Sequence, residues 1–225
     1  MNQSLPALSI AALGVLLVAT AGVAAYGEAV PFALSSMSEE DQYAALIDWH
    51  LPIGASPSAK IAILDDCATA ITSIYGRSRP TTDRQSLLQS CRSLAASVTS
   101  ELPSSSYAWL IGAVDAIEGN DVAEFNRQLE ISQSVGPDEQ WVAEQRVELA
   151  EMHYDKLNDA TRGGEVKDLA LLAQSYRGVQ TIAQRYVSHP DFRERITTVV
   201  ETLPPADQQR FVSNVRRAAA ESVGS

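Results

Sequence analysis

Apolar and polar positions along most of this chain follow the spacing of amphipathic α-helices, but the first segment has a different pattern. Residues 5–25 carry no charge. A helix needs about 20 predominantly apolar residues to cross the hydrocarbon core of a bilayer. The pattern therefore predicts a membrane anchor or a signal segment within residues 1–27. Its aliphatic residues other than alanine are Leu5, Leu8, Ile10, Leu13, Val15, Leu16, Leu17, Val18 and Val23.

Two features of this segment bear on whether it is cleaved. Small residues at Ala19 and Ala21, and again at Val23 to Ala25, fit the pattern that signal peptidase requires. A signal peptide normally opens with basic residues, however, and residues 1–4 contain neither Lys nor Arg. We therefore predict an uncleaved transmembrane anchor, and the alternative is a cleaved signal peptide.

The charges after this segment predict its orientation. Lys60 is the first basic residue, and several acids precede it, so no positive charge on that flank opposes translocation. We expect a single-pass inner-membrane protein with its C-terminal domain in the periplasm of a bacterial envelope. If the segment is cleaved, the product is a soluble periplasmic protein.

Beyond the first segment, apolar residues recur at intervals of three and four, which predicts an all-α chain. We expect an entry helix and linker over residues 28–56, followed by an exported array of antiparallel helical hairpins over residues 57–225. The hairpins form either an α-solenoid or an irregular helical bundle. The expected helix ends are Gly76, Pro103, Gly119, Gly136, the pair Gly163 and Gly164, Pro190 and Pro204, and one long helix is expected from Leu169 to Tyr186. The expected N-terminal caps include Ser38, Ser56, Ser104 and either Asn120 or Asp121.

The two cysteines fit an oxidising compartment. Cys67 lies nine residues before the turn that runs from Gly76 to Thr82, and Cys91 lies nine residues after it. In an antiparallel helix pair the two side chains are then at the same height, as a disulfide between facing helices requires. The sequence predicts a Cys67–Cys91 disulfide, and two buried free thiols are the alternative.

Residues 109–137 resemble one degenerate tetratricopeptide (TPR) repeat, within a match over residues 106–139. Trp109, Ala113, Leu129 and Pro137 occupy the positions where that family places a large residue, a small residue, a large residue and a closing proline. The turn at Gly119 and Asn120 also fits. The departures from the family pattern are Ala116, Phe125 and Ser132. The resemblance implies stacked hairpins whose concave face binds a peptide or protein.

The charge balance narrows the class of partner. With 17 basic and 28 acidic residues the formal charge is -11, which opposes binding to nucleic acid. Acids predominate from Asp115 to Glu151, whereas basic residues predominate from Arg162 to Arg217. We expect a protein partner bound to the membrane, with an anionic polysaccharide as the alternative. The residues predicted for this interaction surface are Arg177, Arg185, Arg193, Arg195, Trp109 and Trp141.

Motifs for catalysis, metal binding and nucleotide binding are missing from the sequence. We predict no enzyme activity, no cofactor and no metal. Glu151, His153 and Asp155 are one or two positions apart, so they point in different directions from a helix, and we assign them to a solvated face.

Together these patterns predict a membrane-anchored extracytoplasmic TPR-like scaffold of a cell-envelope complex. The expected setting is polysaccharide assembly or export. The alternatives are a periplasmic glycan-acting enzyme, which requires convergent carboxylates with perturbed pKa values, and a cleaved soluble periplasmic binding protein.

Overall fold

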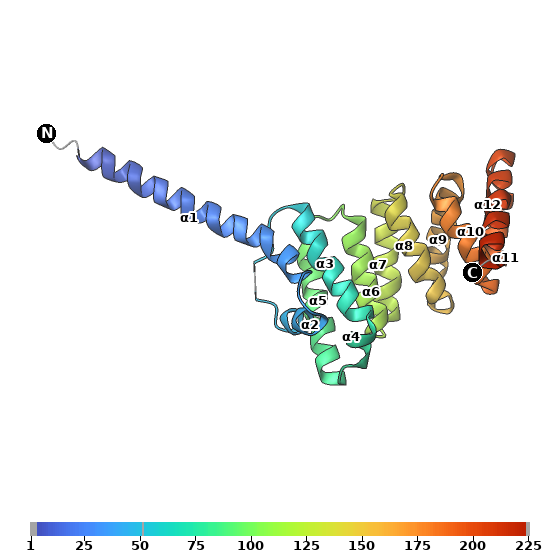
Figure 1. Cartoon of the computed structure of the whole chain (residues 1–225), viewed down its shortest axis with the longest axis horizontal. Coiled ribbons are helices and arrows are strands. Elements are labelled where there is room, and N and C mark those ends of the chain that lie inside the picture. The colour runs from blue at the N-terminus through green and yellow to red at the C-terminus, as the bar shows by residue number, and fades with distance from the viewer. Residues whose placement is uncertain (1–3, 51, 224–225) are drawn as a thin grey trace. The chain divides into compact units, whose positions relative to one another are not determined.

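The computed structural model describes residues 4–50 and 52–223. Within these ranges the chain forms helices and no strand, which confirms the predicted all-α class (Figure 1). The first three residues of the predicted anchor lie outside the described residues, as do the last two of the chain. The chain divides into two compact units, unit 1 (Met1–Val98) and unit 2 (Thr99–Ser225).

Unit 1 is built from a long N-terminal helix and four further helices. They are α1 (Ser4–Leu34), α2 (Glu39–Ile47), α3 (Pro57–Thr72), α4 (Ile74–Ser78) and α5 (Thr81–Glu101), whose last turn reaches into unit 2. The helix starts follow the sequence closely, because the Ser38 and Ser56 hydroxyls accept hydrogen bonds from the first turns of α2 and α3.

The first long helix of unit 1 ends earlier than the sequence predicted. Gly76 was expected to stop it, but α3 ends at Thr72 and Gly76 lies inside the short α4. The Ser73 hydroxyl accepts a hydrogen bond from the Gly76 N–H at 3.0 Å, which starts α4 directly after α3. A Cβ at Gly76 would lie 1.8 Å from the Ala70 carbonyl oxygen, so this glycine permits a close approach rather than a helix end.

Cys67 of α3 and Cys91 of α5 are joined as a disulfide, as the register of the two helices predicted. Their Cα atoms lie 5.7 Å apart, and both residues are fully buried. The neighbouring core residues Leu64, Ile71 and Leu87 are also fully buried. The disulfide therefore lies inside the hydrophobic core of unit 1.

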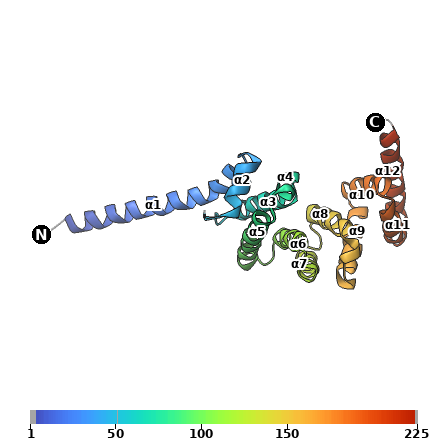
Figure 2. The same cartoon turned by 90° about the horizontal axis from the view of Figure 1, so that it is seen from below.

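Unit 2 is built from seven α-helices and two short 3-10 turns among its described residues. The α-helices are α6 (Ser106–Glu118), α7 (Val122–Val135), α8 (Gln140–Met152), α9 (Asp159–Gln174), α10 (Gly178–Ser188), α11 (Arg193–Glu201) and α12 (Pro205–Val223). The 3-10 turns are Tyr154–Lys156 and Pro190–Phe192. Successive helices lie side by side, with α6 beside α7 and α8 beside α9 (Figures 1 and 2).

The α6–α7 hairpin has the layout expected from residues 109–137. Asn120 forms its turn with a φ of 62°, and the Asp121 side chain accepts a hydrogen bond from the Glu124 N–H, which caps α7. Ser105, one residue after the expected Ser104, caps α6. Ala113 and Phe125 are fully buried between the helices.

Two helix boundaries in unit 2 differ from the prediction. Gly163 and Gly164 were expected to separate helices, but both lie inside α9, which begins where the Asn158 side chain caps Thr161. The long helix expected from Leu169 to Tyr186 is instead broken at Ser175, whose hydroxyl accepts from the Gly178 N–H at 2.9 Å. Local side-chain caps set both boundaries. In α9 the cap and the packed face outweigh the low helix propensity of the two glycines.

Candidate functional site

The N-terminal part of α1 presents an apolar surface that nothing in unit 1 covers. Every side chain from Ala12 to Tyr26 is exposed. Among the described residues, the stretch Ala12–Leu34 is the one helical segment long and apolar enough to cross a membrane, with a mean hydropathy of 1.7. Val15 is 71% exposed and Val18 is 74% exposed. An apolar surface of this extent marks a membrane span, a signal sequence or a binding surface.

The environment of α1 changes abruptly after Tyr26. Gly27, Val30, Pro31 and Leu34 are buried, and their spacing places them on one face of the helix. This face packs against unit 1, where α1 contacts α3. The boundary between the exposed and packed parts lies one residue beyond the charge-free residues 5–25. The packed part, residues 27–34, is hereafter the docked segment.

Hydrogen bonds fix the docked segment to the start of α3. The Glu28 carboxylate accepts from the Ser56 N–H at 2.9 Å and also from the Ser56 hydroxyl. A Cβ at Gly27 would lie 3.6 Å from the Gly54 Cα, so the two backbones are in close contact. The exposed part of α1 is therefore continuous with a helix whose end is fixed in the core of unit 1.

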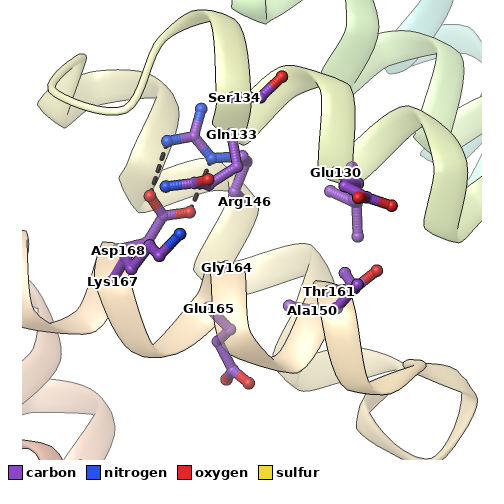
Figure 3. Close-up of a pocket in the computed structure, with 12 residues that line it drawn as sticks. Glu130, Gln133, Ser134, Arg146, Ala150, Thr161, Gly164, Glu165, Lys167 and Asp168 are labelled. Atoms are coloured by element: carbon purple, nitrogen blue, oxygen red, sulfur yellow. Dashed lines mark hydrogen bonds and ion pairs between the residues drawn. The ribbon is translucent and has the colours of Figure 1, made fainter.

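Unit 2 contains a pocket of about 310 Å³ between α7, α8 and α9 (Figure 3). Leu129 and Ala150 supply apolar surface. Gln133, Ser134 and Lys167 supply an amide, a hydroxyl and an ammonium group. This combination of apolar surface and a few polar groups suits a peptide segment or a small polar molecule.

A buried ion pair forms one wall of this pocket. Arg146 of α8 donates from Nε and Nη2 to the two carboxylate oxygens of Asp168 of α9, each at 2.7 Å. Both side chains are 3% exposed. Arg146 also donates from Nη1 to the Ser132 carbonyl at 3.3 Å and from Nη2 to the Gly136 carbonyl at 3.2 Å. One guanidinium thus joins α8 to α9 and to the end of α7.

A second buried cluster lies beside the pocket, where Glu151 and Glu165 lie close enough for each to shift the pKa of the other. Arg195 of α11 donates to both carboxylate oxygens of Glu151, whose side chain is only 1% exposed. Glu151 is therefore buried, and its assignment to a solvated face was wrong. Because the helix ends at Met152, the side chain of Glu151 points toward α11 instead of solvent.

The two glutamates have opposite pKa shifts. Burial raises the pKa of Glu165 to about 9, and the hydrogen bond and negative charge of Glu151 add to the effect. Burial also raises the pKa of Glu151, but the hydrogen bonds from Arg195 and Glu165 outweigh it and hold that pKa below its usual range. The pair therefore holds one proton at neutral pH, on Glu165.

This arrangement differs from the carboxyl pair of a glycoside hydrolase. Such enzymes separate the two carboxyl groups by about 5–10 Å to accommodate the sugar or a water, whereas the Glu151 carboxylate is bonded to Arg195 and its side chain is only 1% exposed. Figure 3 shows the Glu165 carboxyl group directed away from Arg146 and Asp168. The perturbed pair therefore lends no support to the glycan-acting alternative.

The raised pKa of Glu165 predicts a pH effect on stability. Between pH 4.5 and about 9 the folded protein holds a proton on Glu165 that the unfolded chain releases, so stability falls as pH rises through this range. Glu165→Gln cannot ionise. We therefore expect the free energy of unfolding of this variant to increase with pH relative to that of the original chain, by at most about 1.4 kcal/mol per pH unit. Urea unfolding at a series of pH values measures this difference.

Glu130→Gln is the matched control for this experiment, because Glu130 lines the same pocket but is exposed. We expect Glu130→Gln to follow the pH profile of the original chain. Parallel profiles for Glu165→Gln and the original chain would show that Glu165 is ionised in the folded protein.

The predicted arginine surface is largely used within the fold of unit 2. Arg195 pairs with Glu151, and its guanidinium lies 4.2 Å from the Tyr154 ring centroid. Arg193 donates to the Tyr186 and Val187 carbonyls near the end of α10. Arg185 lies over the Phe192 ring. Arg177 is exposed before α10. Three of the four arginines therefore make bonds or ring contacts within unit 2.

The two tryptophans predicted for the surface have different environments. Trp109 donates from Nε1 to the Pro103 carbonyl at 2.9 Å, and Arg127 lies over its ring. Trp141 is 49% exposed and packs on Tyr107, with ring centroids 4.9 Å apart. Trp109 thus serves the structure of the α6–α7 hairpin, whereas Trp141 keeps half of its surface accessible.

Sequence reasoning missed the polar groups at the pocket. Glu165 and Asp168 precede Leu169 and Leu172 on the buried face of α9. Acidic residues at core-facing positions of a helix are the signal that could have located them, because a buried carboxyl group needs a partner or a proton. The misplaced break at Gly163 and Gly164 concealed that pattern.

Comparison of the chain with models of protein families, with curated proteins and with solved structures gave no match.

Proposed function

We propose that this protein is a single-pass, membrane-anchored scaffold whose helical domain lies outside the cytoplasm and binds a protein partner. The anchor is supported by a sharp change in side-chain exposure along α1. The helix is exposed and apolar up to Tyr26, and it is docked on unit 1 from Gly27 onward. A bilayer would cover the exposed part, which removes about 25 cal/mol of unfavourable hydration per Å² of apolar surface.

An anchor is favoured over a cleaved signal because α1 runs as one helix from Ser4 to Leu34. The small residues at Ala21 and Ala25 lie inside this helix. A chain cleaved after Ala25 would keep the docked segment and would be recovered as a soluble protein that begins at Tyr26.

The disulfide and the charge pattern support an extracytoplasmic domain. Disulfides persist in the bacterial periplasm and in the secretory lumen, and they are rare in the cytosol. The exposed acids Glu39, Glu40 and Asp41 follow the docked segment, and the first basic residue is Lys60. We propose the periplasm of a bacterial envelope as the compartment, with polysaccharide assembly or export as the setting.

Unit 2 is proposed as the partner-binding part, in the manner of TPR-like hairpin proteins. The α7–α9 pocket combines a Leu129–Ala150 apolar surface with an amide, a hydroxyl and an ammonium group. A peptide backbone offers the donors and acceptors that such groups bind. A protein is favoured over an anionic polysaccharide, because Glu130 lines the pocket and Arg193 and Arg195 bond within the fold.

Two adjacent glycines of α9 give a matched test of the pocket. Gly164 lines it, and a Cβ there would contact Gln133 at 3.4 Å, whereas a Cβ at Gly163 would meet nothing within 4 Å. We expect Gly164→Phe to fill the pocket and to reduce partner recovery at least about tenfold, the effect of losing about 1.4 kcal/mol. Gly163→Phe carries the same change in helix propensity and should leave recovery unchanged.

The measurement is quantitative mass spectrometry of proteins that copurify with the full-length chain from gently solubilised membranes. A partner recovered equally with both variants would place the binding surface outside the pocket. Recovery of no reproducible partner with the original chain would contradict the scaffold.

A further inference from the structure

Unit 1 has an uncharged surface at the level where α1 emerges from the proposed membrane span. The last part of the connection between α2 and α3, residues 52–56, is joined to the docked segment at two points and is hereafter the α2–α3 loop. Asp48 and His50, which lie earlier in the connection, are exposed and bond to each other. Ser56 bonds to Glu28, and Gly54 lies against Gly27. At about 1.5 Å of rise per residue, Gly27 and Glu28 lie about 3–5 Å beyond Ala25, and Glu28 is the first charged residue after the apolar segment. The loop therefore lies at nearly the same height as the end of that segment.

The headgroup layer of a bilayer occupies this height. It extends about 5–7 Å beyond the hydrocarbon core on each side. Since residues 5–25 match the thickness of the core, Tyr26 and the α2–α3 loop fall within this layer. Tyr26 is 54% exposed, and tyrosine is enriched at membrane–water interfaces.

The sequence of the loop fits such a position. Residues 51–59 contain no charged side chain, although charged residues are frequent before and after them. Pro52, Ala55 and Pro57 are exposed, and Ile53 is partly exposed. In Figures 1 and 2 the loop lies on the side of unit 1 that faces the N-terminal end of α1. The uncharged surface is thus directed toward the span instead of away from it.

We propose that the α2–α3 loop is seated in the phospholipid headgroup layer, so that unit 1 rests directly on the membrane. This inference rests on the proposed anchor. The lipid chemistry it requires is a neutral interface, because the loop offers no cation to an anionic headgroup. The docked segment and the loop together form a second attachment that restricts tilting of unit 1 relative to α1.

Site-specific fluorescence tests the proposal with the full-length chain in phosphatidylcholine vesicles. Both native cysteines form the disulfide, so an introduced cysteine is the one thiol available for labelling. Ala55→Cys reports on the loop. Ile74→Cys is the matched control in the same unit, because Ile74 is 90% exposed and follows the far end of α3, about 24 Å from the loop. Leu17→Cys reports on the anchor.

A spin label on the lipid headgroup should quench the Ala55→Cys probe at least about threefold more strongly than the Ile74→Cys probe. A spin label on the acyl chain should quench the Leu17→Cys probe. Replacing a third of the lipid with phosphatidylglycerol should leave the Ala55→Cys result unchanged.

The probes separate the two proposals. If the Leu17→Cys probe is quenched but the Ala55→Cys and Ile74→Cys probes respond equally, the anchor is supported and the seated loop is contradicted. A second copy of the chain that covers the loop would give this result. If the Leu17→Cys probe is not quenched, the anchor itself fails.

Discussion

Replacing Arg146 with methionine is expected to destabilise the protein by about 3–5 kcal/mol, the usual cost of removing one partner from a buried ion pair. Asp168 would keep its buried position, with 3% of its side chain exposed, and would lose both guanidinium hydrogen bonds. The Ser132 and Gly136 carbonyls would lose a donor as well. Thermal unfolding of the full-length chain in mild detergent, followed by circular dichroism, measures the loss.

The pH dependence of this loss distinguishes a broken ion pair from simple loss of packing. Burial raises the pKa of Asp168, and Arg146 opposes that rise. Without Arg146 the carboxyl pKa rises further, so the folded variant holds a proton that the unfolded chain releases. The destabilisation should therefore grow as pH increases from about 4 to 7.

The double variant with Arg146→Met and Asp168→Leu is the control for this prediction. It removes the uncompensated charge and replaces the pair with apolar side chains, which often recovers stability. We expect it to be more stable than Arg146→Met alone, and we expect its difference in stability from the original chain to lose the increase with pH from about 4 to 7. If both variants are equally unstable and independent of pH, the ion pair is not formed in the folded protein.

Loss of the disulfide is expected to have the second largest effect. Its sequence separation of 24 corresponds to about 3 kcal/mol of chain entropy removed from the unfolded state. The double variant with Cys67→Ala and Cys91→Ala should unfold at a correspondingly lower urea concentration. Because both cysteines are fully buried, reduction should require partial unfolding of unit 1.

Dithiothreitol provides the control for the disulfide. The reductant should lower the stability of the original chain toward that of the double variant, and it should leave the variant unchanged. Equal stability of the original chain with and without reductant, together with two reactive thiols after unfolding, would show that the two cysteines are not joined.

The sequence was sufficient for features that depend on local pattern and register. Counting from the turn placed Cys67 opposite Cys91, because helices rise by a constant amount per residue. The caps at Ser38, Ser56 and Asp121 were recognised because a polar side chain before an apolar repeat satisfies the first N–H groups of a helix. These features require no knowledge of distant contacts.

The missed features depend on contacts between distant segments. Gly163 and Gly164 favour a break locally, yet they lie in a helix whose buried face carries Leu169 and Leu172. Likewise, nothing in the sequence near Glu151 indicates that Arg195, on another helix, neutralises it. Burial of a charged residue is decided by its partners, and those partners are known only when the helices are packed.

The internal bonds of the arginines could not be predicted from the sequence for the same reason, because their partners lie on other segments of the chain. Arg193 follows the end of α10 and bonds to two of its carbonyls, which favour cations at a helix C-terminus. Arginines of unit 2 thus stabilise a helix end and a buried acid. Of the residues predicted for the surface, Arg177, Arg193 and Trp141 are exposed.

The anchor is tested most directly by the mass of the N-terminal peptide and the fraction in which the chain is found. Full-length protein expressed in a bacterium is separated into soluble and membrane fractions, the membranes are washed with alkaline carbonate, and the chain is analysed by mass spectrometry. We predict that it stays in the washed membranes with residues 5–25 intact. A soluble periplasmic protein that begins at Tyr26 would contradict the anchor.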